Sequence, residues 1–288
     1  MSPAALVHSL AVGLVTGSFY AFLALAFALV LAITRVLNLA HGELVVLGGY
    51  IGYSLWKAWG LPPLLLVPLA ALASLPLGAI WRGLLGRVRE PVELNSLVLT
   101  FGLGLLLQNL MLGVWAGDYR LIAGDAAPPL ALGGIALPRG RLLVAAISLG
   151  TVGALHLVLT RTRWGTALRA TSLDPEAAGL MGINTDRASL TSFLLAAAIA
   201  GGGGVLFATF HYLHPAAGVE LTLLAIALSI LGGVGRLSGL LLGGLLIGVV
   251  EALALTWAGP EWRELVVAAI VLLLLLLRSR GLVAGRGH

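Results

Sequence analysis

The sequence predicts an all-α fold, a polytopic bundle of about eight to ten transmembrane helices with one short helix outside the membrane. Of its 288 residues, 59% are hydrophobic and 10% are charged, and the mean hydropathy is +1.05, far from the balance of a soluble domain. Apolar runs near the roughly 20 residues needed to cross a bilayer recur along the whole length. Because no polar stretch remains for a soluble domain, we treat residues 1–288 as a single transmembrane domain.

Nine apolar segments are candidates for membrane spans. The first lacks a basic leader and a cleavage site, so we interpret it as a retained span that is long enough to tilt or to contain a break. The seventh is short and ends in Leu-Gly-Gly-Val-Gly, which is typical of a broken or re-entrant helix. In chain order the segments are 6–33, 44–59, 62–81, 94–116, 142–160, 189–210, 220–235, 239–258 and 264–277.

Glycine is abundant, with 39 residues gathered partly in clusters at 201–204, 231–235 and 243–248. Small residues let helix backbones approach closely, so close packing is one interpretation of the clusters. The other is that they let helices unwind or slide during a transport cycle. Both interpretations favour a packed helical bundle.

The basic residues indicate an orientation. If all nine segments cross, the N-terminus lies outside and the C-terminus inside, and 12 of the 17 basic side chains lie inside. This bias agrees with the positive-inside rule. It places a loop at about 161–188 in the cytoplasm and makes residues 117–141 the longest external loop. We therefore attribute the excess of arginine to membrane orientation and to contacts with lipid headgroups, and we expect no nucleic-acid partner.

The cytoplasmic loop contains a well-punctuated short helix in the stretch TSLDPEAAGLMGINTDR, residues 171–187. Asp174 is a good N-cap, and Pro175 suits the first helical position because it lacks an N–H. Glu176 places negative charge in the first turn, where the helix dipole is positive. Gly182 is suited to end the helix.

One face of this short helix is apolar. Ala177, Leu180 and Met181 are spaced i, i+3 and i+4 and share that face. Two interpretations stay open: the face is buried against its own chain, or it binds a hydrophobic groove of a cytoplasmic partner.

The order Glu176-Ala177-Ala178, with Gly182 after three further residues, resembles the EAA loop of ATP-binding-cassette (ABC) importer permeases. The 27 residues from Arg161 to Arg187 are similar to the same loop in the branched-chain amino acid permeases, the LivH and LivM family. The general EAA pattern ends in a hydrophobic residue and a proline. This sequence has Gly-Ile-Asn, residues 182–184, at that place. The resemblance implies a coupling helix that docks on an ATP-hydrolysing subunit through Asp174, Glu176, Ala177, Ala178, Leu180, Met181 and Gly182.

A second polar group lies in RVLNLAHGELVVLGGY, residues 35–50, and also resembles that family. Asn38, His41 and Glu43 lie at the start of an apolar span. Two interpretations stay open: they belong to a capped helix start at the membrane edge, where water can reach Glu43, or they are functional groups at membrane depth. His41 and Glu43 are spaced i, i+2 and point to different faces with no third ligand nearby, so we expect no metal site and no catalytic pair.

The fourth span adds polar residues that could line a pathway or hydrogen-bond between helices. Gln108 and Asn109 are adjacent, so at most one of them faces a given direction. The candidate pathway residues are Asn38, His41, Glu43, Thr100, Gln108 and Asn109.

No GxxxxGK[S/T] stretch occurs, so the chain lacks the usual phosphate cradle for ATP. ATP would be used by partner subunits, and we expect no cofactor in this chain. The resemblance implies a LivH-like permease subunit of an importer for branched-chain or related amino acids, in the bacterial inner membrane. Its partners would be a LivM-like second permease, two cytoplasmic ATP-binding subunits and an extracytoplasmic binding protein.

Three alternatives stay open at this point. A permease of the same family could carry urea or short amides. An ion-coupled secondary carrier would need charged residues near the membrane midplane. A membrane-embedded enzyme would need a nucleophile with a base, or metal ligands, and we find none with suitable spacing; the absence of cysteine also excludes thiolate chemistry.

Overall fold

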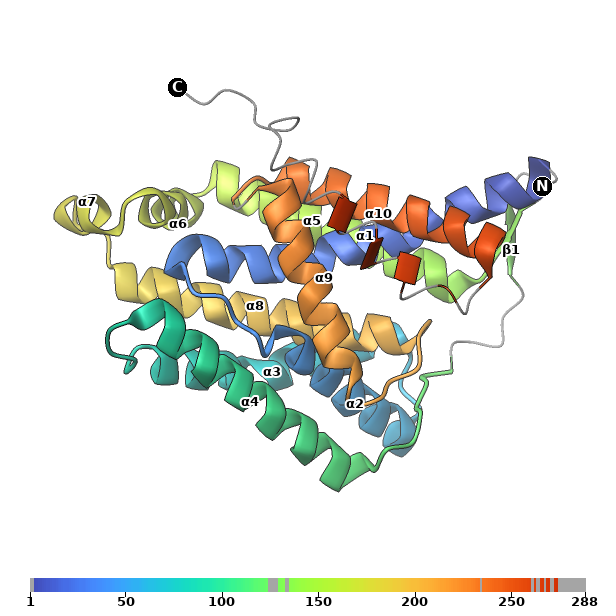
Figure 1. The fold of residues 1–288 in the computed structure, drawn as a ribbon, viewed down its shortest axis with the longest axis horizontal. Helices are drawn as coiled ribbons and strands as arrows, with labels where there is room; N and C mark the ends of the chain where they lie inside the picture. Colours follow the sequence, from blue (N-terminus) through green and yellow to red (C-terminus); the bar gives the residue numbers. More distant parts are fainter. Residues whose placement is uncertain are drawn as a thin grey trace.

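The computed structural model describes residues 3–123, 129–132, 135–233 and 235–259, together with 262, 265–266, 268–269 and 272–273. These residues form an elongated helical bundle (Figure 1). The predicted all-α membrane architecture is confirmed, apart from one short antiparallel hairpin in which Leu130 pairs with Leu137. That hairpin falls within the loop predicted at 117–141.

The first eight predicted segments each contain a helix, and the ninth, 264–277, lies mostly outside the described residues. Two further helices, α6 and α7, occupy the predicted cytoplasmic loop. The elements are α1 (Pro3–Thr34), α2 (His41–Trp59), α3 (Pro63–Leu85), α4 (Val92–Trp115), β1 (Leu130–Leu132), β2 (Ile135–Leu137), α5 (Arg139–Arg161), α6 (Arg163–Leu173), α7 (Pro175–Leu180), α8 (Thr185–Ala208), α9 (Ala217–Gly232) and α10 (Leu237–Ala258).

Six of the described helices are long and apolar enough to cross a membrane, namely α1, α3, α4, α5, α8 and α10. The apolar helix α9 has only 16 residues, fewer than the roughly 20 that a crossing needs. Figure 1 shows α9 running obliquely across α1 and α8. The segment predicted at 220–235 is therefore a short, continuous helix, too short for a full crossing.

The core of the bundle lies along α1 and α8. Within their most apolar windows, 83% of α1 and 72% of α8 is buried, against 22% to 33% for α3, α4, α5 and α10. A helix that is apolar all round belongs in a core or a membrane. Hence α1 and α8 form the centre, and the other four long helices present leucine-rich faces outward.

Glycines bring the helices of the core into backbone contact. Along α1 and α10 the pairs Gly13–Gly17 and Gly244–Gly248 face each other in GxxxG spacing. In the same way Gly48 of α2 meets Gly201 of α8. This agrees with the interpretation of the glycine clusters as close helix packing; a role in sliding stays a prediction.

The two ends of the bundle differ. Helices α6 and α7 project beyond the end opposite the N-terminus (Figure 1). Because α1 and α10 are antiparallel, the end of α10 lies at the N-terminal end, where the hydroxyls of Ser9 and Thr256 are 2.7 Å apart.

The α1–α10 contact predicts opposite effects for two identical substitutions. A Cβ at Gly17 would lie 2.7 Å from the Gly244 carbonyl oxygen, whereas a Cβ at Gly150 of α5 meets nothing within 4 Å. Gly17→Ala should therefore lower the free energy of unfolding by about 1–3 kcal/mol through overpacking. Gly150→Ala should leave it unchanged or raise it by up to about 1 kcal/mol through helix propensity. Thermal unfolding in detergent measures both, and equal midpoints would contradict the close packing.

Candidate functional site: a coupling surface and a polar seam

The start of α7 is capped as its sequence predicts. Asp174 has an extended backbone, and its Oδ1 accepts hydrogen bonds from the backbone N–H groups of Glu176 and Ala177, each at 3.0 Å. Pro175 occupies the first helical position, where no donor is lost. Asp174 thereby fixes where α6 ends and α7 begins.

The end of α7 depends on Gly182. Its φ of +82° lies in the left-handed region, which favours glycine. This turn lets the Ile183 N–H donate to the Ala178 carbonyl and the Gly182 N–H to the Gly179 carbonyl, both at 3.0 Å. The pair of bonds is a Schellman motif, so Gly182 ends the helix in the predicted way.

The apolar face of α7 is open. Leu180 and Met181 are 90% and 83% exposed, Ala177 is exposed, and Leu173 at the end of α6 is 80% exposed. Ala178, which the resemblance includes among the docking residues, is instead buried at 4%. We call Leu173, Ala177, Leu180 and Met181 the α7 surface.

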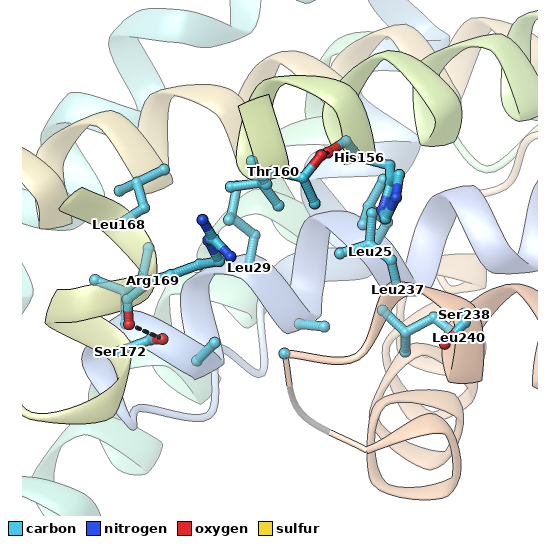
Figure 2. Close-up of a pocket in the computed structure, with 15 residues that line it drawn as sticks. Leu25, Leu29, His156, Thr160, Leu168, Arg169, Ser172, Leu237, Ser238 and Leu240 are labelled. Carbon is cyan, nitrogen blue, oxygen red and sulfur yellow. Dashed lines mark hydrogen bonds between the residues drawn. The ribbon is translucent and has the colours of Figure 1, made fainter. Parts of the chain in front are cut away.

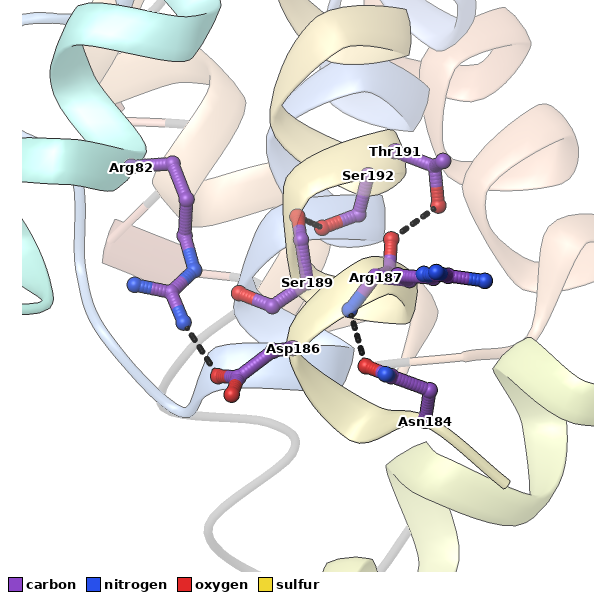
Figure 3. Close-up of polar contacts among 7 residues, drawn as sticks. All are labelled: Arg82, Asn184, Asp186, Arg187, Ser189, Thr191 and Ser192. Atoms are coloured by element: carbon purple, nitrogen blue, oxygen red, sulfur yellow. Dashed lines mark hydrogen bonds and ion pairs between the residues drawn. The ribbon is translucent and has the colours of Figure 1, made fainter. Parts of the chain in front are cut away.

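A polar cluster holds the start of α8 next to α7 (Figure 3). Asn184 caps α8 by accepting from the Arg187 N–H at 2.9 Å. Asp186 pairs with Arg82 near the end of α3 at 2.7 Å. The Asp186 side chain is 88% exposed, so the pair contributes at most about 1 kcal/mol, but it orients the base of α8 against α3.

The second polar group, Asn38, His41 and Glu43, lies at a break between α1 and α2. Arg35 has φ +56°, which ends α1, and residues 36–40 return into the bundle without helical structure. His41, the first residue of α2, places a ring nitrogen 3.3 Å from the Leu23 carbonyl, eleven residues before the end of α1. At 1.5 Å per residue, α2 thus begins about 16 Å inside the bundle. The interpretation of this start as a simple interface cap is wrong.

Side chains from other helices satisfy the backbone of this break. The Thr100 hydroxyl of α4 accepts from the Leu39 N–H at 3.2 Å. The Asn38 side-chain oxygen accepts from the Ala40 N–H at 3.2 Å and from the Trp81 indole N–H at 3.3 Å. Non-helical backbone away from water is stable only when such partners exist.

Helix α9 closes the break from the other side. The Thr222 hydroxyl accepts from the Gly42 N–H at 2.8 Å and donates to the Gly218 carbonyl at 2.9 Å. The N-terminal parts of α2 and α9 therefore meet, and the N-terminal ends of both helices carry partial positive charge there.

Glu43 lies at this meeting point. It is 3% exposed, and a Cβ at Gly218 of α9 would be 2.9 Å from its Oε1, so Gly218 is needed for the approach. Its Oε2 points toward Gly104 of α4 and has no hydrogen-bond partner among the described residues. A buried carboxylate oxygen without a partner is costly and requires an explanation.

Glu43 begins a row of polar groups along α2. Tyr50 and Ser54 follow at i+7 and i+11, so they share its face. The buried Tyr50 hydroxyl also lacks a hydrogen-bond partner among the described residues. Its ring stacks on Trp115 of α4 at 5.0 Å, and Trp115 donates to Ser54 at 2.9 Å. The α2–α4 seam is defined here as Glu43, Tyr50, Ser54, Thr100, Gly104 and Trp115.

The α2–α4 seam opens at the end of the bundle opposite α7. A hollow of about 650 Å³ lies there, lined by residues of both helices that include Tyr53, Ser54, Lys57 and Trp115. Arg120 also lines it and pairs with Asp118 at 3.0 Å. Ser54 and Trp115 belong to both the hollow and the α2–α4 seam, whereas Tyr50 and Glu43 lie buried beyond it.

The predicted pathway residues separate into two groups. Asn38, His41, Glu43 and Thr100 converge on the break, where each is at most 5% exposed. Gln108 is half-buried and Asn109 is exposed, with its amide donating to the Leu105 carbonyl at 2.8 Å on the outward face of α4. Asn109 therefore lies away from the α2–α4 seam. Gln108 follows Gly104 by four residues and precedes Trp115 by seven, so it shares the seam face of α4, and its role in the pathway stays a prediction.

Sequence reasoning missed two buried contacts. Thr222 is part of the break, although its position within an apolar run gives no signal. Glu251 is 3% exposed and accepts a hydrogen bond from the Tyr20 hydroxyl at 2.6 Å. Within the described part of the chain, no three His, Cys, Asp or Glu side chains are grouped so as to hold a metal ion.

Comparisons with known proteins agree with this arrangement. Residues 9–276 match the family described as branched-chain amino acid transport system / permease component. The chain is 28% identical to the permease protein BraD of Pseudomonas aeruginosa over 94% of this chain and 93% of that protein. It is 28% identical to LivH of Escherichia coli K12 over 94% and 92%. Both are named as high-affinity branched-chain amino acid transport system permease proteins.

An archaeal relative extends the comparison. The probable branched-chain amino acid transport permease protein LivH of Methanocaldococcus jannaschii is 30% identical over 80% of this chain and 75% of its own length. No solved structure matches the chain. The family match covers the α7 surface, the break and the α2–α4 seam alike: the chain is a multi-pass membrane protein that belongs to the branched-chain amino acid permease family of ABC transport systems.

Proposed function

We propose that this chain carries branched-chain amino acids into the cell as the LivH-like permease subunit of an ABC importer, driven by separate ATPases that bind the α7 surface. The observation that carries this proposal is the exposure of Leu180 and Met181 on a capped helix beyond the end of the bundle. Large apolar side chains that rigid caps hold in solvent are typical of a binding surface for a partner.

The caps make α7 suitable for transmitting force. Asp174 and Gly182 fix both ends of a six-residue helix, and Asn184 caps α8 two residues after Gly182. Movement of α7 therefore reaches α8 through a short, hydrogen-bonded segment. Because α8 packs on α2 through Gly201 and Gly48, the same movement shifts the helix that carries Glu43.

The α2–α4 seam supplies a route for the substrate. An amino acid is a zwitterion, so its ammonium group needs an acceptor and its carboxylate needs donors inside the bundle. Glu43 Oε2 can accept, the Tyr50 hydroxyl can donate, and neither is engaged in a hydrogen bond among the described residues. The meeting helix N-termini add positive potential for the carboxylate.

The partners and the orientation follow from the same proposal. The α7 end faces the cytoplasm, which agrees with the positive-inside bias, and the hollow beside Lys57 faces the extracytoplasmic binding protein. A LivM-like second permease and two ATP-binding subunits complete the transporter in the bacterial inner membrane. ATP is used by those subunits, this chain needs no cofactor, and its C-terminus lies in the cytoplasm. The C-terminal arginines fall outside the described residues.

Leu180→Asp tests the α7 surface. Burying an unpaired carboxylate in an apolar groove costs several kcal/mol, so ATPase binding should weaken at least about tenfold and uptake should fall with it. Co-purification of the ATPase subunits and uptake of labelled leucine measure the two effects.

The matched control for this test is Leu180→Met, which keeps an exposed apolar side chain and should retain both activities.

Ala177→Arg should also uncouple ATP hydrolysis from uptake while the chain still inserts in the membrane. Normal ATPase binding by Leu180→Asp would contradict the docking role.

Glu43→Gln tests the α2–α4 seam. The substitution preserves shape and removes the charge, so uptake should fall about tenfold while ATPase co-purification is retained. The reason is that an ammonium group binds a carboxylate more strongly than an amide, by about 1.5 kcal/mol.

Glu220→Gln is the control for the seam, since Glu220 lies in the first turn of α9 but is exposed. It should transport normally. Equal uptake by Glu43→Gln and the unmodified chain would contradict a role of Glu43 in substrate transport.

A further inference from the structure

A pocket of about 280 Å³ lies between α1, α5, α6 and the start of α10 (Figure 2). Its floor is apolar and includes Leu25, Leu29, Leu237 and Leu240. Its mouth is polar, where Arg169 of α6 extends toward Thr160 and Leu29 in Figure 2. The lining is thus mostly apolar, and it also carries the polar side chains of His156 and Ser238 near Leu25 and Leu240.

The late start of α10 creates this pocket. Leu237, the first residue of α10, lines the pocket with Leu25 of α1, which precedes the end of α1 by nine residues. At 1.5 Å per residue, α10 leaves about 14 Å of α1 without a neighbour on this side. The gap lies within the α6 half of the bundle.

The charges around the mouth have one sign. Arg169 takes part in neither of the two ion pairs that the described residues form. Arg35 reaches the Leu173 carbonyl at the end of α6, and Arg236 stands between two residues that line the pocket. Helix α6 carries no acidic residue, and none lines the pocket.

We propose that this pocket binds an anionic phospholipid, with its phosphate on Arg169 and the upper part of an acyl chain on the leucine floor. Arginine is well suited to bind phosphate, and basic pockets at the cytoplasmic side of membrane helices attract acidic headgroups. A free phosphate would leave the apolar floor unused. A zwitterionic amino acid would leave its ammonium group facing arginines with no acidic partner.

The bound lipid would hold α6 against the bundle. Because only Asp174 separates α6 from α7, the lipid would set the position of the α7 surface. This regulatory consequence rests on the proposed function, whereas lipid binding itself does not.

Native mass spectrometry of the purified full chain tests the binding. Titration with phosphatidylglycerol should show one tightly retained lipid, and phosphatidylethanolamine should be retained at least tenfold more weakly. Arg169→Gln should weaken phosphatidylglycerol binding about tenfold or more, since a charge-assisted hydrogen bond to phosphate is lost. Arg163→Gln removes the same charge from α6 outside the pocket and should have no effect.

Ala32→Phe provides a second variant that keeps Arg169. Ala32 is half-buried and lines the pocket, so a phenyl ring there should displace the lipid without removing charge. Thermal unfolding confirms that each variant is folded.

The lipid site would be contradicted if Arg169→Gln and Arg163→Gln lost phosphatidylglycerol binding equally. Equal retention of phosphatidylglycerol and phosphatidylethanolamine would also contradict it. So would Arg169-dependent binding of inorganic phosphate or leucine to the lipid-free chain. None of these measurements requires the ATPase partners, so a failure here leaves the proposed transport function standing.

Discussion

The chain turns back at Arg35, and residues 36–40 re-enter the helical bundle without helical structure before α2 begins at His41. The need to satisfy that backbone organises the helices around it. Thr100 comes from α4, Thr222 from α9 and Trp81 from α3, and each supplies a hydrogen bond to the break or to Asn38 within it. These three helices are thereby fixed around one point. The same point holds Glu43, so the structural requirement and the candidate transport group share one location.

Much of the fold could be predicted from the sequence because membrane helices and their caps are governed by local rules. Apolar runs located eight helices, and Asp174, Pro175 and Gly182 predicted both ends of α7. The depth of the break could not be predicted, because "NLAHG" looks the same at a membrane interface and inside a bundle. Only the contact of His41 with Leu23 decides between the two.

The candidate site was predictable to the extent that its chemistry is local. Asn38, His41 and Glu43 are close in sequence, and their polarity in an apolar chain indicated them. Thr222 was missed because a short hydroxyl side chain in an apolar run usually bonds to its own helix. Tyr50 was missed because an aromatic ring in an apolar run is usually explained by packing alone. Gln108 and Asn109 were placed in the pathway by polarity alone, but the rotation of α4 directs Asn109 outward. Helix rotation depends on packing, which a single sequence without a clear amphipathic stripe does not reveal.

The position of α9 constrains how the chain is assembled during synthesis. This 16-residue helix is too short to enter a bilayer as an independent span, and its polar side chains bond to earlier parts of the chain. Thr222 bonds to Gly42, and Ser229 donates to the Ala24 carbonyl at 3.4 Å. Those acceptors and donors exist only after α1 and α2 are in place. We therefore expect α9 to enter the bundle by docking on α1 and α2, which precede it in the chain, instead of inserting as a span of its own.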